Sequence, residues 1–120
     1  MFALNFISPH NEKLLIARQK SATIRLGDIR DIYSENSIVW ITFGNKYGPK
    51  KKLYEAIIDK ALTKKFCDLT TKELIHQNPA ISTVDELIRT FEAIYEKQIH
   101  VDDTVTVIHF TEVVSEQDLL

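Results

Sequence analysis

The hydrophobic positions along the chain recur with the period of strands in some segments and of helices in others. Residues 21–26 alternate between apolar and polar side chains, which predicts a strand. Residues 37–43 are apolar on both faces, which predicts a strand buried on both sides, with Trp40 in the core. Three more strands are predicted from apolar runs, over residues 3–7, 53–60 and 104–110.

Helical spacing and capping residues predict three helices, over residues 9–18, 71–77 and 84–95. A Ser-Pro pair opens the first helix, and an Asn-Pro pair ends the second. Thr70 or Thr71 caps the second helix, and Thr83 caps the third with Glu86 as its capping-box partner. Six apolar residues of the third helix recur at helical spacing, and all are predicted to pack on the sheet: Val84, Leu87, Ile88, Phe91, Ile94 and Tyr95.

These elements predict an α+β fold, because strands and helices occur without a regular βαβ repeat. We expect a small mixed or antiparallel β-barrel of five or six strands, flanked by two or three helices. The chain has 120 residues, of which 44% are hydrophobic, so it can bury a core as a single domain. Residues 1–114 are expected to form this domain and residues 115–120 a flexible C-terminal tail.

The formal net charge of −2 conceals an uneven distribution along the chain. Residues 1–65 contain 12 Lys and Arg against 6 Asp and Glu, whereas residues 66–120 contain 3 against 11. Such asymmetry is typical of a protein that presents one basic surface to an anionic partner. The basic half is therefore expected to contact the ligand.

Other features of the composition bear on location and cofactors. No apolar run reaches the roughly 18 residues that span a bilayer, so no membrane partner is expected. The lone Cys67 fits a reducing cytoplasm, and we expect it to be a small core residue. The four histidines lack zinc-site spacing, so neither a metal nor a cofactor is expected.

The most informative segment is the predicted strand that follows Lys20, which reads K-x-x-T-x-R. Thr23 and Arg25 are two residues apart, so their side chains project from the same face of a strand, and Lys20 enters from the preceding loop. Arginine grips a phosphate or carboxylate through two hydrogen bonds, and a desolvated lysine acts as base for a threonine hydroxyl. The pattern indicates an anion-binding or catalytic site. The alternative is a solvated sheet face on which Arg25 pairs with Asp28.

A second basic segment, residues 44–52, has the composition of a turn. It combines one aromatic side chain with four cations: Lys46, Tyr47, Lys50, Lys51 and Lys52. Proteins recognise RNA by stacking bases on aromatic side chains and by contacting the backbone, so these residues are candidates for RNA contact. The alternative is a solubilising hairpin loop.

The chain resembles the ASCH family (activating signal cointegrator homology) of the PUA-like superfamily over nearly all of residues 2–113. Four motifs carry the likeness: the opening strand and helix followed by K-x-x-T-x-R, Val39-Trp40-Ile41, Leu69-Thr70, and the run over residues 102–110. The resemblance implies a small β-barrel with flanking helices and a cleft lined by the K-x-x-T-x-R strand. It also implies RNA or nucleotide binding in that cleft.

Some small ASCH proteins are amidohydrolases that remove the acetyl group from acetylcytidine. The resemblance implies Lys20 as their general base and Thr23 as their nucleophile. Their catalytic glutamate aligns with Gln77, and a glutamine neither carries a negative charge nor shuttles a proton. Glu73, one helical turn earlier, is the substitute candidate. The residues on either side of Gln77 are further candidates for ligand contact: His76 and Asn78.

Two functions of different classes follow from these residues. The first is a monomeric RNA- or nucleotide-binding module with a basic cleft around the K-x-x-T-x-R strand. The second is an amidohydrolase acting on acetylcytidine-type nucleosides. RNA or nucleotide binding is the preferred hypothesis, because Gln77 occupies the position at which an amidohydrolase of this kind requires a carboxylate. A third hypothesis is a scaffold or ligand-sensing domain that binds a small anion in the same cleft.

Overall fold

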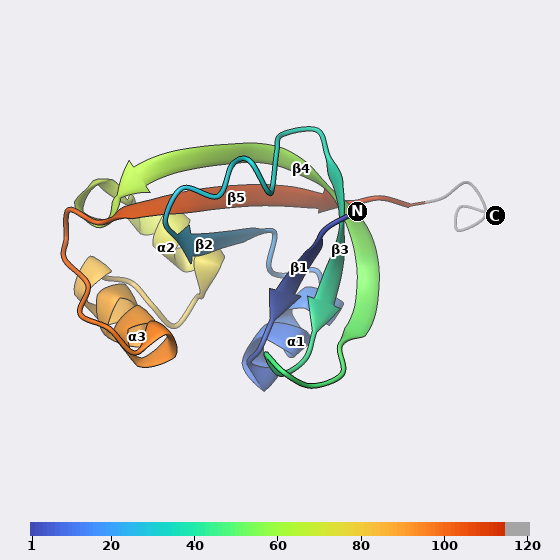
Figure 1. The fold of residues 1–120 in the computed structure, drawn as a ribbon, viewed down its shortest axis with the longest axis horizontal. Helices are drawn as coiled ribbons and strands as arrows, with labels where there is room; N and C mark the ends of the chain where they lie inside the picture. Colours follow the sequence, from blue (N-terminus) through green and yellow to red (C-terminus); the bar gives the residue numbers. More distant parts are fainter. Residues whose placement is uncertain (115–120) are drawn as a thin grey trace.

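Five strands form one mixed sheet in the order β1-β3-β4-β5-β2 in the computed structural model, which describes residues 1–114. The strands are β1 (Ala3–Phe6), β2 (Ala22–Leu26), β3 (Ile38–Phe43), β4 (Lys51–Lys65) and β5 (Thr104–Glu112). β1 and β3 run parallel, and the other neighbouring pairs are antiparallel. The sheet curls into a half-barrel, with β1 and β2 as its two edges (Figure 1). The predicted tail, residues 115–120, lies outside the described residues.

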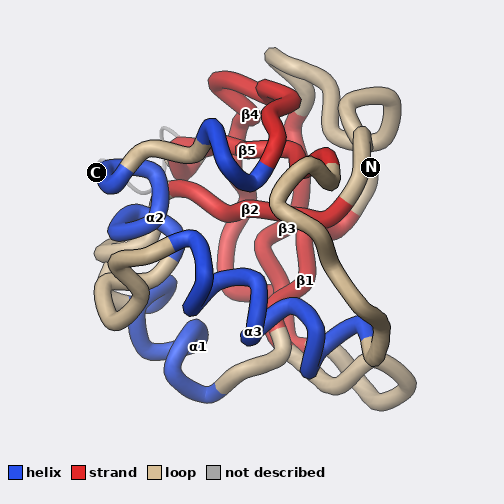
Figure 2. Tube along the Cα trace, turned by 90° about the vertical axis from the view of Figure 1, so that its left-hand side faces the viewer, coloured by secondary structure: helices blue, strands red, loops and turns tan. Residues whose placement is uncertain are grey.

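Three α-helices and one 3₁₀ turn complete the fold: α1 (Pro9–Ile16), η1 (Phe66–Asp68), α2 (Thr71–Gln77) and α3 (Val84–Tyr95). In Figure 2 α1, α2 and α3 lie on the left side and in the lower half of the view, and the strands lie together in its centre. The prediction of an α+β fold built on a small mixed, curled sheet is confirmed.

The longest strand, β4, bends across the molecule and joins the two halves of the sheet (Figure 1). Its first part pairs with β3 and its later part with β5, and the register with β5 shifts between Ile58 and Lys60. Such a β-bulge leaves one residue unpaired and sharpens the bend of the strand. The strand predicted over residues 53–60 was too short at both ends, because the lysines at both ends obscure the alternation.

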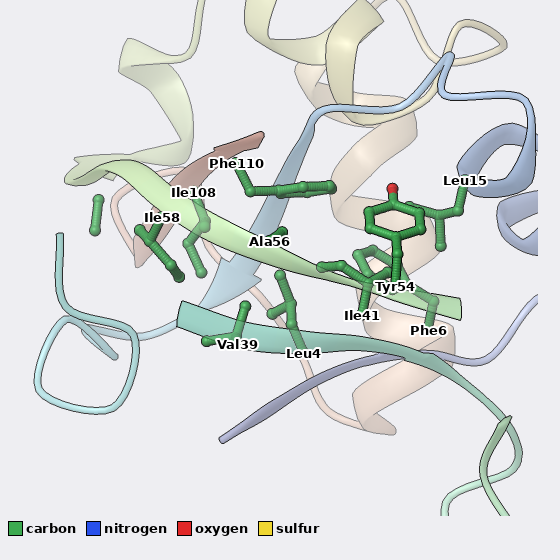
Figure 3. Packing of buried hydrophobic residues seen from close by; sticks show 11 residues of the cluster. Leu4, Phe6, Leu15, Val39, Ile41, Tyr54, Ala56, Ile58, Ile108 and Phe110 are labelled. Carbon is green, nitrogen blue, oxygen red and sulfur yellow. The ribbon is translucent and has the colours of Figure 1, made fainter. Parts of the chain in front are cut away.

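The core consists of two clusters on opposite faces of the β2–β5 pair. Thr23 lies opposite Ile108 in the register, and Ile24 lies opposite Val107, so each pair shares a face. Ile108 belongs to the cluster inside the half-barrel, which Figure 3 shows between the strands. Ile24 and Val107 belong to the second cluster, which packs against α2, α3 and η1. β2 is therefore covered on both faces.

Trp40 is not a core residue, which corrects the prediction for residues 37–43. Val39 and Ile41 are buried, but Ile38 and Trp40 are 42% and 41% exposed. Among residues 1–114 no helix or strand covers the outer face of β3, so the apolar residues on that face remain at the surface. The Lys52 Nζ atom lies 5.2 Å from the centre of the Trp40 ring and shields part of it.

The helix caps follow the sequence, whereas the apolar face of α3 does not fully bury. Thr70 forms a reciprocal capping box with Glu73, and the Thr83 side chain caps α3 by accepting from the Glu86 N–H. Of the six apolar residues of α3, the buried ones are Leu87, Ile88 and Phe91. Ile94 and Tyr95, which were predicted to pack on the sheet, are 50% and 41% exposed.

Two further observations concern the composition. Cys67 is exposed on η1, so the prediction of a core cysteine was wrong. Within residues 1–114, no helix combines the length and apolar character that crossing a membrane requires.

The loop after β2 depends on the fully buried hydroxyl of Thr106 in β5. This hydroxyl donates to the Gly27 carbonyl at 2.7 Å and accepts from the Ile29 N–H at 3.1 Å. We expect Thr106→Val to lower the free energy of unfolding by about 1–3 kcal/mol, because both backbone groups lose their partner. Urea unfolding measures this change. Thr104→Val, an exposed position on the same strand, is the control, and an equal loss in both variants would contradict the argument.

Candidate ligand-binding cleft

A cleft of about 440 Å³ lies where the two edge strands of the half-barrel face each other. β1, β2, the end of α2 and the last turns of α3 all contribute to its wall, together with α1 and the turn after β3. Its lining residues are Asn5, Phe6, Ile7, Asn11, Thr23, Ile24, Arg25, Lys46, Lys50, Gln77, Phe91, Ile94 and Tyr95. The resemblance predicted a cleft along the K-x-x-T-x-R strand, and two residues of that pattern line this one.

Arg25 bridges the two edge strands. Its Nη2 atom donates to the Asn5 carbonyl of β1 at 2.9 Å, and its Nε atom donates to the Thr23 hydroxyl at 3.3 Å. The guanidinium lies over the Phe6 ring, 4.8 Å from the ring centre. No ion pair links Arg25 to a carboxylate in the described part of the chain. Burial lowers the pKa of Arg25, but an arginine stays charged at neutral pH.

The alternative pairing of Arg25 with Asp28 is wrong. The Asp28 carboxylate instead binds Arg30, with 2.8 Å between Arg30 Nη2 and Asp28 Oδ2. The strand face that carries Arg25 is also not solvated, because Thr23 on the same face is buried.

Lys20 lies behind the cleft wall and is only 2% exposed. Its Nζ atom donates to the Gln77 carbonyl oxygen and lies 3.4 Å from the Gln77 side-chain oxygen. Burial lowers the pKa of Lys20 to about 7, and the positive charge of Arg25 adds to the effect. No carboxylate lies within ion-pair distance of Lys20 among residues 1–114.

Gln77 connects α2 to the free edge of β2. Its Oε1 atom accepts from the Ile24 N–H at 2.7 Å. The Gly27 N–H donates to the Thr104 carbonyl at 2.8 Å at one end of the β2–β5 pair, and this hydrogen bond fixes which backbone groups face β5. By the alternation of an antiparallel pair, the Ile24 N–H points to the unpaired edge. The glutamine side chain thus satisfies a backbone donor that no strand reaches.

Glu73, the substitute candidate for the catalytic carboxylate, lies outside this cleft. Its Oε1 atom accepts from the Lys64 ammonium at 2.8 Å and from the Thr70 N–H at 2.9 Å. Partial burial opposes ionisation, but hydrogen bonds from Lys64 and Thr70 hold the pKa of Glu73 below its usual value. The carboxylate is occupied in capping α2 and in an ion pair.

The two neighbours of Gln77 also point elsewhere. His76 lines a different pocket, which it shares with β4 and β5 residues. The Asn78 side-chain oxygen accepts from the Ala80 N–H at 2.9 Å, so Asn78 ends the helix and stabilises the turn that follows. Of these three consecutive residues, only Gln77 contributes to the cleft.

The basic turn after β3 lies at the cleft, and only two of its four lysines line the cleft. Lys46 and Lys50 line the cleft, and the Lys50 ammonium donates to the carbonyls of Asn45, Lys46 and Gly48 at 3.0–3.3 Å. The turn closes tightly at Gly44, where a Cβ atom would lie 2.4 Å from the Pro49 carbonyl oxygen. These contacts hold the turn together and fix the Lys50 side chain at the cleft.

The other side chains of this turn do not line the cleft. Lys51 lies 3.9 Å from a Glu12 carboxylate oxygen, and Lys52 lies 3.1 Å from one of Glu55. Tyr47 is 93% exposed and contacts the ammonium of Lys46 at 5.3 Å from the ring centre. It is free to reach a ligand outside the cleft.

Sequence reasoning missed the apolar wall of the cleft, formed by Phe91, Ile94 and Tyr95 of α3. The Tyr95 ring packs edge-on against the Phe91 ring, with 5.7 Å between their centres. The signal was present in the sequence, because the apolar stripe of this helix continues one turn beyond the residues that the core needs. No group of three or more His, Cys, Asp or Glu side chains among residues 1–114 has the arrangement of a metal site.

The same fold occurs in solved structures that cover nearly the whole chain. A structure of an ASCH domain from Lactobacillus crispatus JV V101 superposes with a TM-score of 0.64 at 10% identity, covering 92% of this chain and 77% of that one. The chain has the fold of an ASCH domain. The protein EF3133 from Enterococcus faecalis V583, of the family DUF984, gives a TM-score of 0.66 at 15% identity over 94% of this chain and 81% of its own.

A third solved structure extends the comparison. The hypothetical protein PH0355 superposes on this ASCH fold with a TM-score of 0.64 at 16% identity, covering 93% of this chain and 98% of that one. The sequence matches no family model and no curated protein. The resemblance inferred from the motifs is therefore confirmed at the level of the ASCH fold.

The lowered pKa of Lys20 predicts a pH-dependent stability. Above about pH 7 the folded chain releases a proton that the unfolded chain retains up to its ordinary lysine pKa, so stability rises with pH. From about pH 7 to about pH 9, the free energy of unfolding should rise by about 2 kcal/mol more in the native chain than in Lys20→Met. Urea unfolding at both pH values measures it. Equal pH slopes in the two proteins would contradict the burial of this ammonium.

Proposed function

We propose that the protein binds RNA or a nucleotide in the cleft between β1 and β2. The observation that carries this proposal is the charge of the lining: three cationic side chains, Arg25, Lys46 and Lys50, and no carboxylate among the described residues that form the wall. The proposal includes the expectations of a monomer and of a cytoplasmic location.

The cationic wall suits a phosphate group. The Arg25 guanidinium is fixed by Asn5 and Thr23, so little side-chain entropy is lost when it donates to an anion. Within residues 1–114 it also has no carboxylate partner that a phosphate would need to displace. Lys46 and Lys50 add two further ammonium groups, and the Lys50 ammonium is held at the turn by its hydrogen bonds to the carbonyls of Asn45 and Lys46.

The apolar wall suits a nucleobase. Ile94 and Tyr95 are half exposed, and they face the cleft rather than the core. A base that stacks on the Tyr95 ring would cover apolar surface, and every base offers a face for such stacking. The cationic and apolar walls together match the two chemical parts of a nucleotide.

The likeness to an ASCH domain supports the same proposal, because that family resemblance implies RNA or nucleotide binding at the K-x-x-T-x-R strand. In this arrangement Thr23 and Gln77 are positioning residues. Thr23 holds the Arg25 guanidinium, and Gln77 holds the edge of β2 from which Arg25 projects. Lys20 holds Gln77 in turn.

RNA binding should depend on salt through Lys46 and Lys50. We expect the logarithm of the affinity for a labelled single-stranded RNA to fall linearly with the logarithm of salt concentration. Each of Lys46→Ala and Lys50→Ala should reduce that slope by roughly 0.7, the value for one phosphate contact of a single strand. Fluorescence anisotropy at several salt concentrations measures both effects.

Two controls separate the walls of the cleft. Lys65→Ala removes an exposed charge at the far end of β4 and should leave the slope unchanged. Tyr95→Ala should weaken binding by about 1–3 kcal/mol without changing the slope, whereas Tyr95→Phe should retain stacking. Binding that shows no salt slope, or that responds equally to Lys65→Ala and Lys46→Ala, would rule out this proposal.

The amidohydrolase is the second candidate, and one observation favours it. The pKa of Lys20, lowered to about 7 by burial, is near the range in which a lysine acts as a base. Against it, Lys20 contacts the amide of Gln77 rather than a carboxylate, and Lys20 does not line the cleft. Binding therefore ranks first.

Incubation with acetylcytidine tests the second candidate. Hydrolysis would add water across the amide and release cytidine and acetate. We expect no cytidine above the uncatalysed rate, as measured by chromatography, because no carboxylate assists Lys20. Turnover that Lys20→Ala and Thr23→Ala both abolish would reverse this ranking.

A further inference from the structure

A second pocket, of about 510 Å³, shares no lining residue with the cleft. It lies where α2 meets β4 and β5. Its size is in the range of small-molecule sites. Its polar lining comprises Ser21, Asp59, Lys60, Lys64, Thr70, Lys72, Glu73, His76, His109 and Thr111.

Both carboxylates of this pocket already have partners. The Asp59 carboxylate accepts from the Thr111 hydroxyl at 2.6 Å. The Glu73 carboxylate accepts from Lys64 at 2.8 Å and from the cap of α2. Each acid is therefore already held by a neighbouring side chain of the pocket.

Four basic side chains of the pocket remain unpaired. Within the described part of the chain, the side chains of Lys60, Lys72, His76 and His109 form neither a hydrogen bond nor an ion pair. His109 is half buried, and burial lowers its pKa. The Glu73 and Asp59 carboxylates oppose this shift, while the positive charges of His76 and Lys60 add to it. The groups therefore interact across one shared space.

The charge of this space depends on the two histidines. Charged groups face it from three elements: Asp59, Lys60 and Lys64 of β4, Lys72, Glu73 and His76 of α2, and His109 of β5. The lysines exceed the carboxylates by one when both histidines are neutral. Protonation of both histidines adds two further charges, which suits a doubly charged anion.

We propose that this pocket binds the phosphate group of a phosphate monoester through Lys60, Lys72, His76 and His109. Affinity for a doubly charged anion increases as the pH falls from about 8 to about 6, because each histidine that gains a proton adds a positive charge to the pocket. Leu62 and Phe110 also line the pocket and offer apolar surface to the organic part of the ester. This site is separate from the proposed cleft and does not depend on it.

Histidine titration by NMR tests the proposal on the native chain. Sulfate is the probe, because it keeps its double charge over this pH range, and chloride at equal ionic strength is the reference. We expect sulfate to raise the pKa values of His76 and His109 by about half a pH unit or more, because a bound anion favours the charged form. His10 and His100, which are exposed elsewhere, should not respond. Equal shifts of all four histidines, or none, would overturn the proposal.

Variants then assign the lysines. Lys60→Ala and Lys72→Ala should each weaken sulfate binding at least fivefold, and Lys97→Ala, an exposed lysine outside the pocket, should not. Equal affinity in all three variants would show that the ion does not occupy this pocket. Folding of each variant is checked by its unchanged amide spectrum.

Two further probes distinguish the phosphate of a monoester from the phosphates of an RNA backbone. Inorganic phosphate should shift His76 and His109 as sulfate does, also in the Tyr95→Ala variant, which alters only the cleft. A single-stranded RNA without a terminal phosphate should not shift them. If that RNA shifts both histidines and sulfate does not, the pocket follows a polynucleotide backbone, and the monoester site is rejected.

Discussion

The arrangement of the molecule depends on how a half-barrel completes the hydrogen bonds of its two unpaired edges. β1 and β2 end the sheet, and each presents backbone groups that no neighbouring strand reaches. Side chains take over this role. Arg25 donates to the Asn5 carbonyl, the Tyr33 hydroxyl donates to the Ala3 carbonyl at 2.8 Å, and Gln77 accepts from the Ile24 N–H. Arg25 and Gln77, which line the cleft, are thus among the groups that close the fold.

This mode of closure places positive charge where water is largely excluded. Lys20 is buried and Arg25 is partly buried beside the Phe6 ring, and neither has a carboxylate partner among the described residues. Removing a charge from water costs free energy, which carbonyl oxygens and an aromatic face offset only in part. Lys20 responds through its lowered pKa, whereas an arginine remains charged. An anion in the cleft would therefore find a cation already oriented toward it.

The sequence predicted the elements that depend on local rules. It failed for side chains whose exposure depends on whether another element covers them. Capping residues located α1 and α2, and the alternation over residues 21–26 located Thr23 and Arg25 on one face. The exposure of Trp40 could not be read in this way, because it depends on β3 having no cover on its outer face. The same holds for Ile94 and Tyr95. Their periodicity is that of a core face, but the cleft begins where the core ends.

The direction of charged side chains was equally beyond local reasoning. Four lysines lie close together in the basic turn and carry the same charge, so the sequence gives no reason to distinguish them. Only Lys46 and Lys50 line the cleft. The turn closes tightly at Gly44, whereas Lys51 and Lys52 already belong to β4, in which successive side chains point to opposite faces. By contrast, the charge asymmetry of the chain was informative, because all three cations of the cleft come from the basic half.

Position 77 is where closure of the fold and chemistry of the cleft meet. The Gln77 side chain satisfies the Ile24 N–H, and its backbone carbonyl holds Lys20. A glutamate oxygen would accept from the same N–H, but its charge would also neutralise Lys20 and raise the pKa of that lysine. Glutamine keeps the structural contact without supplying a proton acceptor of suitable pKa. The residue type at this one position therefore favours a cationic binding cleft over a hydrolytic centre, although the backbone around it suits both.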